Sequence, residues 1–157
     1  MGDIIITNVA VYREVVEESY ASMQETMRKQ CRPKANGEPG LIKTYDPSKK
    51  SFKQAMICTV FAGMWLEAAL HILLVRRNGE DVAKKADKKT WEEKLQILGV
   101  CDNEILGIVC KFRRSRKDLV HEKAFFTQDA VSIAQDEAEL AHRVMGLVEA
   151  VFKTRGQ

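Results

Sequence analysis

The chain has 157 residues, of which 45% are hydrophobic and 30% are charged, so it can bury the core of a single domain over residues 1–157. Its net charge of +3 at pH 7 excludes a polycation, so any binding to nucleic acid needs a local basic patch. We find no signal peptide and no run of roughly 18 apolar residues, so we expect a cytoplasmic protein that has no transmembrane helix and binds no membrane.

Two long helices with a loop between them are predicted for the first half of the chain. In the first helix, apolar residues recur at steps of three and four: Val9, Tyr12, Val16, Tyr20, Met23 and Met27. This pattern predicts an amphipathic helix over residues 8–30. Residues 31–50 contain all three prolines, so we expect a flexible loop there, which is long for a compact domain. A second helix is predicted from Ser51 to Arg77, with Ser51 as its N-cap.

The second helix is apolar on nearly every face, which is typical of a helix at the centre of a bundle or of a dimer. Only Glu67 and His71 interrupt its middle, one helical turn apart on the same face. They are either an ordinary pair on the less buried side of the helix or two residues that face a site. Because one short bundle covers little surface, we expect a homodimer with a two-fold interface on this helix.

Shorter elements follow in the second half of the chain. Residues 76–89 are polar and contain the turn signal Asn78-Gly79. Thr90-Trp91-Glu92-Glu93 matches a capping box, which predicts a short helix that ends near Gly99.

A helix capped by Asp102 is predicted next, and residues 124–131 are expected to form a loop. A second capping box at Ser132 precedes an amphipathic C-terminal helix whose inward residues are Leu140, Val144, Leu147, Val148, Val151 and Phe152. Since no alternating strand pattern is found, we expect an all-α, up-and-down bundle of four to five helices.

The familiar catalytic motifs are absent from the chain. There is no glycine-rich phosphate loop, no H-E-x-x-H, no G-x-S-x-G and no dinucleotide fingerprint. The four cysteines form no C-x-x-C pair and have no histidine at zinc-ligand spacing, so we expect reduced thiols, no metal and no cofactor.

What remains is a basic segment at the end of the helix capped by Asp102. Residues 111–123 contain six basic and two acidic residues. Such a segment is either a solvated helix end that interacts favourably with the helix dipole, or a binding site for phosphate.

Arg116 and His121 favour the second interpretation, since they stand five residues apart in the sequence R-K-D-L-V-H. Histidine transfers protons near neutral pH, and the planar guanidinium of arginine fits a pair of phosphate oxygens. Together they suffice for attack of an RNA 2′-hydroxyl on the adjacent phosphorus, which yields a 2′,3′-cyclic phosphate and a 5′-hydroxyl without a metal.

An all-helical bundle with R-K-D-L-V-H at the close of its penultimate long helix resembles the HEPN superfamily, whose hallmark is R-x4–6-H at that place. The resemblance implies a dimeric, metal-independent endoribonuclease of a defence, stress or toxin–antitoxin system, with RNA as substrate and an antitoxin or regulatory protein as a further partner. It assigns catalysis to Arg116 and His121, with Asp118 as an orienting residue. Glu67 and His71 resemble the family's glutamate and basic residue of the second helix.

The surrounding positions depart from the family pattern in two places. Lys117 stands where the family often has Asn or Asp, and Lys123 stands where many toxin members carry a tyrosine. We expect Arg113, Arg114, Lys117 and Lys123 to contact the RNA backbone. A non-catalytic module that binds RNA or a partner protein, and a purely structural helical bundle, remain as alternatives.

Overall fold

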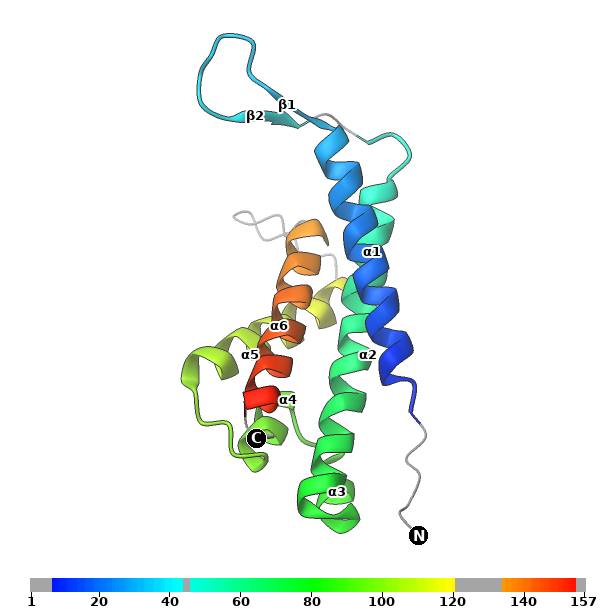
Figure 1. Cartoon of the computed structure of the whole chain (residues 1–157), viewed down its shortest axis with the longest axis vertical. Helices are drawn as coiled ribbons and strands as arrows, with labels where there is room; N and C mark the ends of the chain where they lie inside the picture. The colour runs from blue at the N-terminus through cyan, green and yellow to red at the C-terminus, as the bar shows by residue number, and fades with distance from the viewer. Residues whose placement is uncertain (1–6, 44–45, 121–133, 155–157) are drawn as a thin grey trace.

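The computed structural model of the chain describes residues 7–43, 46–120 and 134–154. Within these residues six helices and one small sheet are found (Figure 1). The helices are α1 (Val9–Lys29), α2 (Lys50–Asn78), α3 (Glu80–Ala86), α4 (Trp91–Ile97), α5 (Asn103–Val120) and α6 (Ala134–Thr154). The sheet consists of β1 (Cys31–Pro33) and β2 (Leu41–Lys43). The predicted all-α character is confirmed, with more helices than expected and one hairpin in addition.

The hairpin corrects the prediction that residues 31–50 form a loop without strands. Its two strands pair antiparallel, with Cys31 opposite Lys43 and Pro33 opposite Leu41. Gly37 and Gly40 adopt positive φ angles of 69° and 124° in the connection, where residues with a side chain are strained. The strands have three residues each, which is too short for an alternating pattern to stand out.

Helix α3 corrects the prediction that residues 76–89 form only a polar turn. Gly79, with a φ of 86°, ends α2, and a new helix begins at the next residue. Glu80 and Asp81 occupy its first turn, where negative charge interacts favourably with the helix dipole. Ala83 and Ala86 bury their small side chains in the core, and such a short apolar face gives little periodic signal.

The helix starts follow local hydrogen-bonding rules, with one correction. The Thr90 capping box is present, and the carboxylate of Asp102 accepts hydrogen bonds from the first turn of α5. Ser51 is not the N-cap of α2, because Lys49 holds that position with a φ of 54°. The Ser51 amide instead donates to the carboxylate of Asp46 at 3.1 Å. The second capping box, at Ser132, lies outside the described residues.

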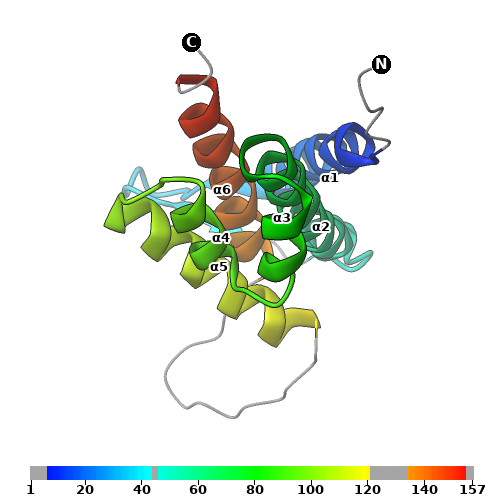
Figure 2. The ribbon, with the colours of Figure 1, turned by 90° about the horizontal axis from the view of Figure 1, so that it is seen from below.

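Helix α2 is the centre of the bundle. It packs against every other helix, most extensively against α1 and α6. In Figure 1 the hairpin lies beyond one end of α1 and α3 closes the opposite end of α2, while Figure 2 shows α4 and α5 beside α2 and α6. All six helices contribute to the core, whose large fully buried residues include Val16, Met23, Leu66, Leu70, Leu74, Leu95, Val109, Phe112, Val144 and Val148.

By length and composition α2 could also cross a membrane, since only Glu67 and His71 interrupt its apolar middle. One helix of this kind is weak evidence for a membrane span, so the expectation of no transmembrane helix stays a prediction. In the bundle 44% of the most apolar window of α2 is buried, and core helices of soluble proteins commonly share this composition. The fold is compatible with a soluble protein.

Candidate functional site

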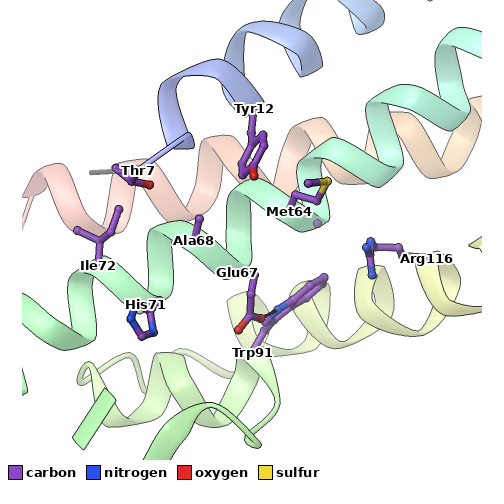
Figure 3. Close-up of a pocket in the computed structure, with 10 residues that line it drawn as sticks. Thr7, Tyr12, Met64, Glu67, Ala68, His71, Ile72, Trp91 and Arg116 are labelled. Carbon is purple, nitrogen blue, oxygen red and sulfur yellow. Dashed lines mark hydrogen bonds between the residues drawn. The ribbon is translucent and has the colours of Figure 1, made fainter. Parts of the chain in front are cut away.

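An open cleft of about 650 Å³ lies beside α2, between that helix, α4 and α5. Figure 3 shows how the side chains around it are arranged. From α2 come Gly63, Met64, Glu67, Ala68, His71 and Ile72, while Thr7, Tyr12, Trp91 and Arg116 complete the lining. Three of the sequence-predicted site residues, Glu67, His71 and Arg116, therefore line the same cleft although they come from two helices.

Arg116 reaches the cleft because residue 63 of α2 has no side chain. A Cβ atom at Gly63 would lie 2.6 Å from Cδ and 2.8 Å from Cζ of Arg116, so any side chain there would displace the arginine. The guanidinium also lies over the indole of Trp91, with Cζ 5.9 Å from the ring centroid. Gly63 and Trp91 thus hold Arg116 between two helices.

The guanidinium of Arg116 is half-buried, and it is not neutralised by an ion pair with any residue that the structure describes. Its Nε atom is buried and has no hydrogen-bond partner among these residues. Burial lowers the pKa of Arg116 from its ordinary value, while the negative charge of Glu67 raises it in part. Because the ordinary pKa of arginine is so high, the group stays protonated, and a buried cationic donor without a partner favours an anion in the cleft.

Glu67, which lines the cleft, accepts hydrogen bonds from two side chains of α4. One carboxylate oxygen accepts from the indole Nε1 of Trp91 at 2.7 Å, and the other is paired with the ammonium group of Lys94. The Lys94 side chain is only 1% exposed, whereas that of Glu67 is 50% exposed. Both donors stand on α4, three residues apart, so the short helix presents them together to α2.

His71, one turn after Glu67 on α2, lines the same cleft. Nδ1 of His71 lies 3.5 Å from a carboxylate oxygen of Asp87, and both side chains are about half exposed. Glu67 and His71 do not contact each other directly by any hydrogen bond found in the described structure, so they are two separate contributions to the cleft wall.

Arg113 does not lie on the cleft. Its Nε and a terminal nitrogen donate to the carboxylate of Glu92 at 3.0 to 3.1 Å. Burial alone would raise the pKa of Glu92, but the hydrogen bonds from Arg113 and Cys110 outweigh it and hold that pKa below its usual value. The same carboxylate raises the pKa of Arg113. This ion pair joins α4 to α5.

The remaining predicted residues divide into two groups. Arg114, Lys117 and Asp118 are exposed on α5. His121 and Lys123 lie outside the described residues, so the structure does not place them relative to Arg116. Helix α5 is described up to Val120, the residue directly before His121.

Sequence reasoning missed two residues of this site, Gly63 and Lys94, and did not assign Trp91 to it, because a tryptophan is more often a core or interface residue. Trp91 is indeed buried, at 7% exposure, yet one side of it lines the cleft. The capping box at Thr90 predicts where α4 begins, and the three-residue spacing of Trp91 and Lys94 then places them on the same face of that helix. It does not predict which other helix this face contacts.

The lining of the cleft includes one arginine, Arg116, and one carboxylate, Glu67. In the parts of the chain that the structure describes, no three His, Cys, Asp or Glu side chains come together to hold a metal ion. Comparison with known proteins gives no match, whether to protein-family models, to curated proteins or to solved structures.

Proposed function

We propose that the protein is a metal-independent endoribonuclease of the HEPN type that acts as a homodimer. The observation that carries this proposal is Arg116, whose guanidinium is held in an open cleft and forms no ion pair with any carboxylate that the structure describes. Arginine in such a site binds a phosphate through two hydrogen bonds and stabilises the charge that develops on it during reaction. The HEPN resemblance assigns the same residue to the scissile phosphate.

The reaction needs a group that moves protons, and His121 supplies it in this proposal. Arg116 stands in the last two turns of α5, and His121 is the next residue in the sequence after Val120, the last described residue of that helix. The substrate provides its own nucleophile: the 2′-hydroxyl loses its proton to a base, its oxygen bonds to the adjacent phosphorus, and the 5′-oxygen leaves as a hydroxyl. A histidine can serve as the base or protonate the leaving oxygen near neutral pH.

A second copy of the chain fits the apolar side of α2. Ile57 and Met64 are exposed there, at 37% and 36%, although they are large and apolar. The same side continues into Ala68 and Ile72, which line the cleft. Because a two-fold contact uses the same surface twice, a dimer formed here brings two clefts together.

Replacing His121 with alanine tests the catalytic assignment. We expect RNA cleavage to be lost, while helicity by circular dichroism and the molar mass by light scattering stay unchanged. His142→Ala is the matched control, because His142 stacks on Tyr20 and bonds to Glu17 on the α1–α6 side of the bundle. Cleavage that persists in His121→Ala, or that requires added magnesium, contradicts the proposal.

Replacing Ile57 with glutamate tests the dimer, because Ile57 is exposed on this side of α2 and does not line the cleft. A charge in the centre of an apolar contact opposes association, so we expect a folded monomer with little cleavage activity. Leu41→Glu is the control, since Leu41 is 62% exposed on the hairpin and away from this side of α2. A wild-type protein that is monomeric at micromolar concentration contradicts the composite site.

One observation also supports the alternative of a module that binds RNA without cutting it. Lys111, Arg114 and Lys117 are exposed along one side of α5, and within the described residues none of them forms an ion pair. A basic stripe of this kind binds a phosphate backbone whether or not chemistry follows. Salt-sensitive RNA binding with intact RNA recovered distinguishes this alternative from the ribonuclease.

A further inference from the structure

Glu67 is the carboxylate best placed to neutralise Arg116. The arginine lies over Gly63, and Glu67 stands four residues further along the same helix, one turn away. Side chains of a helix lean toward its N-terminus, so the unrestrained carboxylate of Glu67 tends toward the turn that Arg116 covers. Its negative charge already acts on the guanidinium. An ion pair between the two would occupy the group that the proposed function assigns to the RNA phosphate.

In the described structure Glu67 does not pair with Arg116, because two donors of α4 engage its carboxylate. Figure 3 shows its carboxylate against the indole of Trp91, which donates to one oxygen at 2.7 Å. Lys94 is paired with the other oxygen. Both oxygens are thus held by donors of α4, and no ion pair between Glu67 and Arg116 is found among the described residues.

The ion pair with Glu67 stabilises the buried charge of Lys94. Its ammonium group lies in a side chain that is 1% exposed, and a buried ammonium is costly unless it is paired and hydrogen-bonded. Glu67 is the carboxylate with which it pairs in the described structure. The charges of Lys94 and Glu67 then cancel, and the positive charge of Arg116 is left over in the cleft.

We propose that Lys94 is a positioning residue that keeps Arg116 available to RNA by holding Glu67 away from it. This inference rests on the proposed function, in which Arg116 binds the scissile phosphate. It assigns to α4 a role that is distinct from its packing: the helix carries the cation that occupies the competing carboxylate.

Removal of the Lys94 charge tests this role. In Lys94→Met the carboxylate of Glu67 has no counter-ion on α4 and pairs with Arg116 instead. We expect affinity for a fully 2′-O-methylated RNA oligonucleotide, which cannot be cleaved, to fall by about tenfold, the usual value of one charge-assisted contact. Cleavage of the unmodified RNA falls with it.

A second substitution separates positioning from structure. In Lys94→Met/Glu67→Gln the competing negative charge is gone, so RNA binding and cleavage return to near the wild-type level. Lys94→Arg retains the ion pair, so it should bind and cleave RNA like the wild type. This variant tests the role of the charge without the methionine side chain, which could disturb the fold. If the single and the double variant lose equal activity, the positioning role is overturned.

A readout that does not depend on RNA keeps this inference separate from the proposed function. The Nε–Hε NMR signal of Arg116, assigned by its absence in Arg116→Lys, should shift in Lys94→Met and return in the double variant. A shift without any change in RNA binding supports the competition for Glu67 and contradicts the ribonuclease proposal. No shift in Lys94→Met overturns the inference, whatever the RNA experiments give.

Discussion

Gly63 is the point where Arg116 of α5 comes closest to the backbone of α2, and Gly63→Ala tests whether this contact positions the guanidinium. A Cβ atom at residue 63 would lie within 2.6 Å of Cδ and 2.8 Å of Cζ of the arginine. Non-bonded carbon atoms are most stable at about 3.5–4.0 Å. The side chain of Arg116 therefore has to leave its place between Gly63 and Trp91.

Two opposing effects decide the stability of Gly63→Ala. Alanine in a helix interior favours the folded state over glycine by about 1 kcal/mol. Overpacking in a filled contact costs about 1–3 kcal/mol. The free energy of unfolding should thus be between unchanged and about 2 kcal/mol below that of the wild type.

Gly107→Ala is the matched control, because a Cβ atom at Gly107 of α5 meets no heavy atom within 4 Å. Its free energy of unfolding should rise by the full difference in helix propensity between glycine and alanine, about 1 kcal/mol. The two variants should then differ by about 1–3 kcal/mol in urea unfolding followed by circular dichroism. In melting temperature, each kcal/mol corresponds to about 2–4 °C for a domain of this size.

Activity should separate the two variants further than stability does. A displacement of a catalytic group by about 1 Å costs roughly a hundredfold in rate. We expect Gly63→Ala to cleave RNA about a hundred times more slowly than Gly107→Ala, measured under conditions in which both are folded. Equal cleavage rates, or an equal gain in stability, would refute the reasoning that Gly63 makes room for Arg116.

Further predictions concern an ion pair, two thiols and the basic stripe of α5. A double-mutant cycle with Arg113→Ala and Glu92→Gln should give a coupling energy of about 1 kcal/mol. Because the folded pKa of Glu92 is lowered, this contribution is complete above the usual carboxyl pKa and is lost as the pH falls through the lowered value, which acid titration of the cycle checks. Cys101 is exposed and should react with a thiol reagent at once, whereas burial raises the pKa of Cys58 to about 12, so Cys58 should react only on unfolding. Arg114→Glu should weaken RNA binding and reduce its salt dependence by about one phosphate contact without affecting folding, measured by anisotropy titrations at several salt concentrations.

Much of the fold could be predicted from local rules, because apolar residues recur with the helical period along the sequence of a long amphipathic helix. The spacing of Val9, Tyr12 and Val16 predicts α1, and the continuous apolar composition of α2 predicts that it is central. The capping box at Thr90 depends on residues three apart, and the structure contains it. Each of these signals lies within a single segment, so no knowledge of the partner segment is needed.

Local rules do not predict the hairpin and α3, because each element is too short for a periodic pattern to repeat. Their presence depends on neighbours: β1 exists only because β2 pairs with it, and the buried face of α3 consists of two alanines. The apolar composition of α2 likewise does not show its surroundings, because a helix at the centre of a core and a helix that spans a membrane have similar sequences. What distinguishes them is the set of elements packed around the helix.

The three arginines of α5 show why the candidate site could be predicted only in part. Arg113, Arg114 and Arg116 lie within four residues of one another, and the sequence gives all three the same attraction to phosphate. Their positions around the helix send Arg113 to Glu92 on α4, leave Arg114 in solvent and direct Arg116 onto α2. None of these partners is near in sequence. The chemistry of a basic run is therefore local, but which of its charges is free to bind an anion is decided by the carboxylates and the glycine on other helices.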